Sequence, residues 1–282
     1  MTKPRPTFPA RLDLSASPMR HVGAGTSMSA GLLKALVPPT QRVAIHGTSV
    51  SQPARRAMPL APQGHGMDSS AVRLNMVAKL AALGIKDAQV LNAMRTIERH
   101  RFVDSALVNQ AYEDTSLPIG LGQTISKPSV VSRMAELLRN GAPGKLGRVL
   151  EIGTGCGYQA AVLSLLATEV YSMERLRGLH DKARDNLRYL RIPNLHLLFG
   201  DGMAGYPKGG PYAAIIAAAG GEAVPQAWTD QLAVGGRLVA PVCVPGGAAG
   251  QQTLMVIDKT SAGCQQTILE AVLFVPLKSG VA

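Results

Sequence analysis

The sequence predicts an α/β fold with a mostly parallel sheet, a C-terminal antiparallel hairpin and an added N-terminal helical part. From Arg148 onward, short apolar strands alternate with helical segments, the pattern of a parallel sheet that helices cover on both faces. A glycine-rich turn follows the first of these strands. The last two predicted strands are joined by residues 258–265, which leave no room for a helix, so we expect an antiparallel pair at one edge of the sheet.

The predicted elements of this region are short and aliphatic, in keeping with an aromatic content of only 4%. Strands are expected at residues 148–152, 169–173, 195–199, 212–217, 237–242, 252–257 and 268–275. Helices are expected to end near residues 167 and 190, and a further one to cover residues 225–232.

Two helices are predicted ahead of the sheet. Residues 72–83 carry apolar side chains at helical spacing, and Gly84 ends this helix. Residues 88–100 form the second, with Asp87 as its N-terminal cap.

The following segment is expected to be irregular before a third helix begins. Residues 112–123 contain Pro118 and two glycines, which predicts a loop. Ser126 is a candidate N-cap, and Pro128 lies in the first turn, where its missing N–H costs nothing. This third helix is expected to reach about Arg139.

The first 70 residues differ in composition from the rest of the chain. They are rich in Pro, Ser, Gly and Ala, and residues 1–72 hold eight of the 29 basic residues but only two of the 18 acidic ones. We expect a basic, disordered extension over residues 1–70 and a folded domain over residues 71–282. A basic arm can bind nucleic acid, but Phe8 is the one aromatic residue among these basic ones, which is too few for base stacking, so no nucleic-acid partner is expected.

Several classes of protein are disfavoured by what the chain lacks. No apolar run approaches the roughly 20 residues of a membrane helix, so we expect a soluble protein with no membrane partner. The three cysteines (Cys156, Cys243 and Cys264) and the scattered histidines have no metal-ligand spacing, so no metal is expected. An odd cysteine count and no compact signal segment favour the reducing cytoplasm.

The strongest functional signal is the segment from Val149 to Gly157, in which an apolar strand ends at Glu151-Ile152 and is followed by Gly153-Thr154-Gly155-Cys156-Gly157. Such glycines allow a backbone to turn sharply and approach a ligand. The Gly-x-Gly-x-Gly spacing differs from the Gly-x-Gly-x-x-Gly of dinucleotide sites. Glu151 would repel a pyrophosphate but attract the ammonium of a methionine group. We therefore expect a Rossmann-like S-adenosylmethionine site that includes Glu151, Gly153, Thr154, Gly155 and Gly157.

Two further acidic residues end the next two strands. Glu174 is placed to accept the ribose hydroxyls, and Asp201, beside Gly202, is placed to accept the adenine amine. Because the carboxyl ends of parallel strands meet at one edge of the sheet, Glu151, Glu174 and Asp201 should lie next to one another around one ligand.

The segment from Leu117 to Pro128 identifies an acceptor class by resemblance. Its Leu-Pro-Ile-Gly followed by Gly-Gln-Thr-Ile-Ser and a proline resembles the protein-L-isoaspartate O-methyltransferases. The lead-in Arg101-Phe102-Val103, the triplets at 200–202 and 217–219, and the closing Phe274-Val275-Pro276-Leu277 are also similar to that family, in order along residues 80–280.

The resemblance implies methyl transfer from S-adenosylmethionine to the free carboxylate of L-isoaspartyl residues in damaged proteins and peptides, which starts their repair. It also implies a methyltransferase domain in which residues 71–140 supply helices and the substrate loop, and residues 146–282 the cofactor-binding sheet and hairpin. The family's active-site serine maps onto Ser126, and Thr124, Ile125 and Ser126 are the expected substrate-binding residues. The chain is expected to act as a monomer.

Three alternatives remain open at this point. The acceptor could be another carboxylate or a small molecule, or the chain could bind the cofactor without turnover. A nucleic-acid methyltransferase is the least favoured, because alanines occupy positions 217–219, where enzymes acting on exocyclic amines often carry an Asn/Asp-Pro-Pro-aromatic motif.

Overall fold

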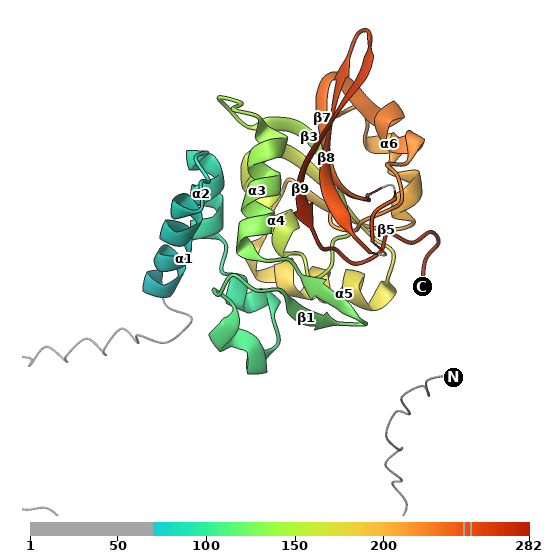
Figure 1. Ribbon diagram of the computed structural model, residues 1–282. Helices are drawn as coiled ribbons and strands as arrows, with labels where there is room; N and C mark the ends of the chain where they lie inside the picture. Colours follow the sequence, from blue (N-terminus) through green and yellow to red (C-terminus); the bar gives the residue numbers. More distant parts are fainter. Residues whose placement is uncertain (1–69, 245, 249) are drawn as a thin grey trace, which may run out of the picture. The chain divides into compact units, whose positions relative to one another are not determined.

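A computed structural model describes residues 70–244, 246–248 and 250–282, all within one structural unit. The expected extension over residues 1–70 lies outside this described part, apart from Ser70. The main sheet has seven strands in the order β5-β4-β3-β6-β7-β8-β9 (Figure 1). Their bounds are β3 Leu146–Ile152, β4 Ala167–Glu174, β5 Leu195–Phe199, β6 Tyr212–Ala217, β7 Leu232–Cys243, β8 Gln252–Thr260 and β9 Gly263–Val272. Strands β3 to β7 run parallel, so the predicted α/β fold is confirmed.

Helices pack on both faces of this sheet because its central strands are apolar on both sides. Side chains such as Val149 pack with residues of α3 (Pro128–Arg139) and α4 (Tyr158–Leu166). The next residue, Leu150, points the other way and packs with Trp228 of α6 (Gln226–Gln231). Helix α5 (Arg177–Leu187) contacts β4 and β5 and shares a core cluster with α4.

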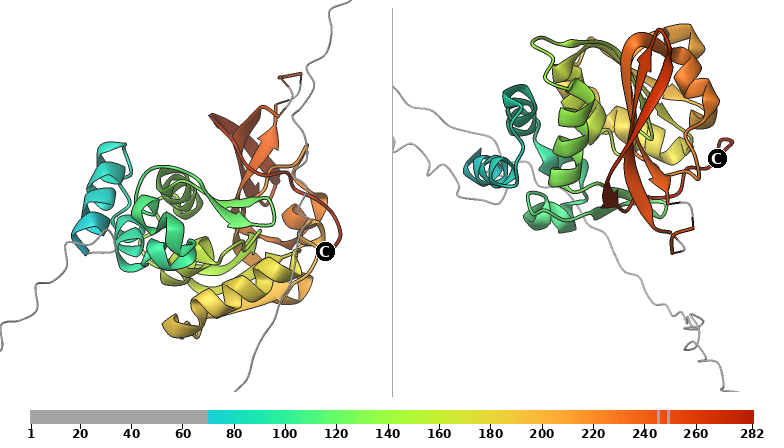
Figure 2. Two further views of the ribbon diagram at one scale, coloured as in Figure 1. Left: turned by 90° about the horizontal axis from the view of Figure 1, so that it is seen from below. Right: turned by 45° about the horizontal axis from the view of Figure 1, so that its top comes forward.

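The strands β8 and β9 form the expected antiparallel hairpin at the edge of the sheet, seen along its length in the right view of Figure 2. Strand β9 begins at Gly263 rather than at the expected residue 268, because pairing with β8 continues down to the contact between Thr260 and Gly263. The segment after β9 returns to the sheet, where Gly220 N donates to Val275 O and Leu277 N donates to Gly220 O.

The N-terminal helical part consists of α1 (Ser70–Ala82), α2 (Ala88–Thr96) and two 3₁₀ helices, η1 (Arg99–Phe102) and η2 (Ser105–Gln110). Asp87 caps α2 as expected, its carboxylate accepting from the N–H groups of Gln89 and Val90. The expectation that this second helix reaches residue 100 is wrong. Ile97 takes an extended conformation and ends α2 at Thr96.

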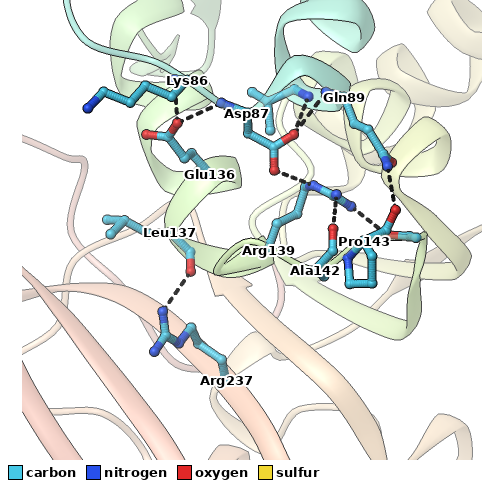
Figure 3. Close-up of polar contacts among 11 residues, drawn as sticks. Lys86, Asp87, Gln89, Glu136, Leu137, Arg139, Ala142, Pro143 and Arg237 are labelled. Carbon is cyan, nitrogen blue, oxygen red and sulfur yellow. Dashed lines mark hydrogen bonds and ion pairs between the residues drawn. The ribbon is translucent and has the colours of Figure 1, made fainter.

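A buried ion pair joins the N-terminal helices to α3 (Figure 3). Arg139 Nε donates to Asp87 Oδ2 at 2.7 Å, and its other nitrogens donate to the carbonyl oxygens of Ala142 and Gly144. The Arg139 side chain is only 2% exposed. Glu136 of the same helix accepts from the N–H of Asp87 at 2.9 Å. The start of α2 is therefore held to the end of α3 by both charge and backbone hydrogen bonds.

A small hairpin occupies the segment for which the sequence predicts a loop. Strands β1 (Leu117–Gly120) and β2 (Gln123–Ile125) pair antiparallel around a turn at Leu121 and Gly122. Pro118 is compatible with a strand here because this two-stranded sheet has only edge strands. Among the described residues, no helix is long and apolar enough to cross a membrane.

Candidate active site

The glycine-rich turn between β3 and α4 has the backbone geometry that the sequence predicts. Gly153, Gly155 and Gly157 all have positive φ angles, of 92°, 57° and 91°. At Gly157 an added Cβ would lie 2.8 Å from Leu187 Cδ1, so Leu187 would have to shift, and the positive φ would strain any other residue. Gly157 precedes the first residue of α4, so the turn leads directly into the N-terminus of a helix.

This turn borders a cavity of about 440 Å³, within the range of about 300–1,000 Å³ typical of small-molecule sites. Four segments line it: the β1–β2 hairpin with Ser126, the glycine turn, the carboxyl ends of β4 to β6, and the chain after β9. Of the predicted site residues, the lining includes Thr124, Ile125, Ser126, Gly153, Thr154, Gly155, Glu174 and Gly202. Most of the predicted cofactor residues and all three predicted substrate residues therefore meet in one cavity.

Glu174 is held in place by backbone groups on either side of it. Its Oε2 accepts from Gly155 N and its Oε1 from Leu176 N, both at 2.9 Å. A carboxylate oxygen can accept more than one hydrogen bond, so both oxygens keep capacity for a ligand. This geometry fits the expected role toward a pair of hydroxyls.

Glu151 does not line the cavity, although it lies directly behind it. The side chain is fully buried, and Ser172 Oγ donates to its Oε2 at 2.5 Å. Ser172 in turn bonds Thr154, which does line the cavity. Burial raises the pKa of Glu151 to about 8, although the hydrogen bond from Ser172 offsets part of this effect. This carboxyl therefore keeps its proton to a higher pH than an exposed glutamate does.

Two buried polar atoms at this place have no hydrogen-bond partner among the described residues. They are Oε1 of Glu151 and Nε2 of Gln159, and Gln159 lines the cavity. Unpaired buried polar atoms are costly unless something satisfies them. The two groups are neighbours, because the Gln159 side chain is among those that lower the pKa of Glu151. Only Gln159 lines the cavity, so it is the group that the polar end of a ligand would meet. Sequence reasoning missed Gln159, which carries no signal beyond its place in the first turn of α4.

Asp201 and Gly157 also lie outside the cavity lining. Asp201 accepts from Met203 N at 2.9 Å and from Gly280 N at 2.7 Å. Its carboxylate thus ties the chain after β9 to the carboxyl end of β5. Neighbouring Gly202 does line the cavity, and an added Cβ there would lie 2.6 Å from Ile152 Cγ2.

Ser126 follows β2 and faces the cavity without capping α3. The expectation that it caps this helix is wrong, because the N-cap is Lys127 and has no side-chain cap bond. Asp114, which is distant in the sequence, binds the first turn of α3 instead. Its carboxylate accepts from Ser129 N at 2.8 Å and from Ser129 Oγ at 2.7 Å. No hydrogen bond of the Ser126 hydroxyl is found within the described part of the chain, so this hydroxyl is available to a ligand.

The described residues contain no group of three or more His, Cys, Asp or Glu side chains that could hold a metal ion. The polar groups that line the cavity are hydroxyls, the Glu174 carboxylate, backbone amides, the amide side chains of Gln123 and Gln159, and the cationic side chains of Arg175 and Lys278. These groups suit binding and orientation of a small polar ligand.

Comparison with known proteins places these features in a family. The model of the protein-L-isoaspartate(D-aspartate) O-methyltransferase family matches residues 71–282. A protein-L-isoaspartate O-methyltransferase of Methylibium petroleiphilum is 53% identical over 280 residues, covering 99% of this chain and 97% of that protein. One from Cupriavidus pinatubonensis is 58% identical over 222 residues, covering 76% of this chain and 75% of that protein.

Solved structures agree with the sequence comparison. A protein-L-isoaspartate O-methyltransferase structure has a TM-score of 0.66 at 28% identity, covering 74% of this chain and 67% of that one. A structure from Plasmodium falciparum in complex with S-adenosyl-L-homocysteine has a TM-score of 0.61 at 24% identity, covering 73% and 98%, and supports the fold. By its family match and its close relatives, the chain belongs to the protein-L-isoaspartate(D-aspartate) O-methyltransferase family.

Proposed function

We propose that this chain transfers a methyl group from S-adenosylmethionine to the free carboxylate of L-isoaspartyl residues in damaged proteins and peptides, the first step of their repair. Family membership carries this proposal, and the shared cavity of Ser126 and the glycine turn supports it. The other carboxylate acceptors and the non-catalytic role that the sequence left open are less consistent with a relative of that name that matches over 97% of its length.

The cofactor's place follows from the groups around the glycine turn. The backbone of Gly153 to Gly155 would face the ligand, Glu174 would accept from the ribose hydroxyls, and the buried pair of Glu151 and Gln159 would serve its amino-acid end. Asp201 would contribute to the adenine side from behind Gly202. When bound, S-adenosylmethionine supplies an electrophilic methyl group and a neutral thioether leaving group.

The reaction makes few chemical demands on the protein. An isoaspartyl carboxylate is ionised at neutral pH, so its oxygen forms the new bond to carbon without a general base. The electron pair of the breaking carbon–sulfur bond stays on sulfur. Because the acceptor oxygen is already ionised, no proton has to be removed. The protein's task is alignment, which can contribute a large share of a rate enhancement. The hydroxyls of Thr124 and Ser126 would donate hydrogen bonds to the acceptor carboxylate and hold it in line.

We further propose that residues 71–282 carry this activity, and that the chain acts as a cytoplasmic monomer without nucleic-acid or membrane partners. The family match to these same residues supports the domain assignment. The three cysteines are all unpaired, which fits a reducing compartment.

The test is transfer of labelled methyl from S-adenosylmethionine to a short peptide with one L-isoaspartyl residue. The same peptide with a normal aspartyl residue is the control substrate, and Ser126→Ala is the control enzyme. We expect base-labile label on the isoaspartyl peptide alone, with a much lower rate for the variant. Equal labelling of both peptides, or no label while the cofactor still binds, would contradict the proposed acceptor.

A further inference from the structure

Arg99 is a fully buried cation whose charge is not neutralised by a bonded carboxylate. The residue is 0% exposed, and the contacts of its guanidinium within the described residues are with backbone carbonyl oxygens and an aromatic ring. Its Nη1 is buried and has no hydrogen-bond partner there. Burying a charge without a counter-charge costs free energy. The role of this side chain therefore depends on the groups to which its other two nitrogens, Nε and Nη2, donate.

Those nitrogens bridge two chain segments that are distant in sequence. Nε donates to Ala111 O and Nη2 donates to Ser126 O, both at 2.8 Å. Ala111 lies shortly before Asp114, whose carboxylate accepts from Ser129 at the start of α3. Ser126 lies directly after β2. The planar fork of a guanidinium fixes the direction of both bonds, which an ammonium group cannot do. One side chain therefore sets where the backbone of Ser126 lies.

The same guanidinium also contacts the cofactor side of the cavity. Its Cζ lies 4.9 Å from the ring centroid of Tyr158, within the range of a cation–π contact. Tyr158 is the first residue of α4, directly after the glycine turn, and it lines the cavity. Arg99 thus connects the backbone of Ser126 to the segment that carries the glycine turn.

We infer that Arg99 is a positioning residue for methyl transfer, which acts by holding Ser126 at a fixed place relative to the glycine turn. This inference rests on the proposed function, since in-line transfer depends on how the acceptor is aligned with the donor. Arg99 does not line the cavity and touches no reacting atom; its effect passes through the Ser126 backbone to the hydroxyl.

The structure provides a matched control for testing this role. Arg139 is another buried arginine that donates to two backbone carbonyl oxygens, but it lies at the α2–α3 junction and contacts nothing in the cavity. Arg99→Lys and Arg139→Lys therefore remove the same fork geometry at comparable burial. Both variants should lose thermal stability, but only one should alter the site.

For Arg99→Lys we expect kcat for the isoaspartyl peptide to fall by roughly tenfold to a hundredfold, as displacement of aligned groups by about 1 Å can cost. The dissociation constant of S-adenosylmethionine, measured by calorimetry, should stay within about threefold, because the glycine turn and Glu174 are intact. Arg139→Lys should leave both quantities unchanged. In the Ser126→Ala background, Arg99→Lys should cause little further loss of kcat, because the hydroxyl that it positions is gone.

Amide hydrogen exchange separates this inference from the proposed function. Residues 124–127 should exchange faster in Arg99→Lys than in the unchanged protein or in Arg139→Lys, whether or not the peptide is methylated. Unchanged exchange at these residues, or losses of kcat that are additive with Ser126→Ala, would overturn the inference. If Arg99→Lys does not fold, Arg99→Gln replaces it. Failure of both to fold while Arg139→Lys folds would assign Arg99 a purely structural role and also overturn it.

Discussion

Replacing Glu151 by glutamine tests whether this buried carboxyl is neutral in the folded, ligand-free protein. The pKa of Glu151 is raised to about 8 from an ordinary value of 4.5, chiefly by burial. Between these two values the folded protein holds a proton that the unfolded chain has lost. Raising the pH through this window therefore favours the unfolded chain, and the loss of stability begins above pH 4.5 and is complete above pH 8.

The size of the effect follows from the two pKa values. A pKa that differs by one between the folded and unfolded states corresponds to about 1.4 kcal/mol, so the Glu151 contribution to the free energy of unfolding falls by roughly 3 to 4 kcal/mol between pH 5 and pH 8. The glutamine side chain in Glu151→Gln cannot ionise but keeps an oxygen that can accept from Ser172. The difference in unfolding free energy between Glu151→Gln and the unchanged protein should therefore grow by that amount across the same range.

The assay is urea unfolding without cofactor at pH 5, 6, 7, 8 and 9, analysed by linear extrapolation for both proteins. Glu222→Gln, at an exposed carboxylate, is the control and should show no such trend. A difference for Glu151→Gln that stays constant from pH 5 to pH 9 would refute the reasoning, since it would mean that Glu151 is ionised throughout.

Two further predictions concern parts of the molecule outside the cavity. Arg139→Ala leaves Asp87 without its charge partner, so the free energy of unfolding should fall by about 3–5 kcal/mol. The control Arg95→Ala removes an exposed side chain and should cost at most about 0.5 kcal/mol. Equal losses for the two variants in urea unfolding would contradict this prediction. A chain that begins at Ser70, the first residue of α1, should keep kcat and KM for the isoaspartyl peptide within about twofold, because the family match starts at residue 71. Loss of activity in a folded truncation would show that the preceding residues belong to the site.

The sheet could be predicted from sequence because its signals are local. Apolar runs such as Tyr212–Ala217 have strand length and are bounded by turn residues, and β6 has those same limits. The short link before β9 left no choice but an antiparallel pair. Asp87 caps α2 by accepting from the N–H groups of the residues two and three positions later in the chain, so this cap can also be predicted from neighbouring residues.

The features that could not be predicted depend on partners far along the chain. Ser126 has every local property of an N-cap, but Asp114, fifteen residues before Ser129, satisfies that helix start instead. Arg99 has no recognisable spacing relative to Ala111 or Ser126. The Leu117–Gly120 strand contains a proline and a glycine, and it forms because β2 folds back on it. In each case tertiary contact decides what local propensity leaves open.

The two sides of the cavity around Thr154 also come from parts of the chain that are synthesised at different times. The predicted glycine turn lies more than a hundred residues before Val275 to Lys278, which close the cavity from the other side. At synthesis rates of about 5–20 residues per second, the turn leaves the ribosome several seconds or more before these residues do. During that interval no complete cavity exists, so a nascent chain cannot gain stability from bound ligand.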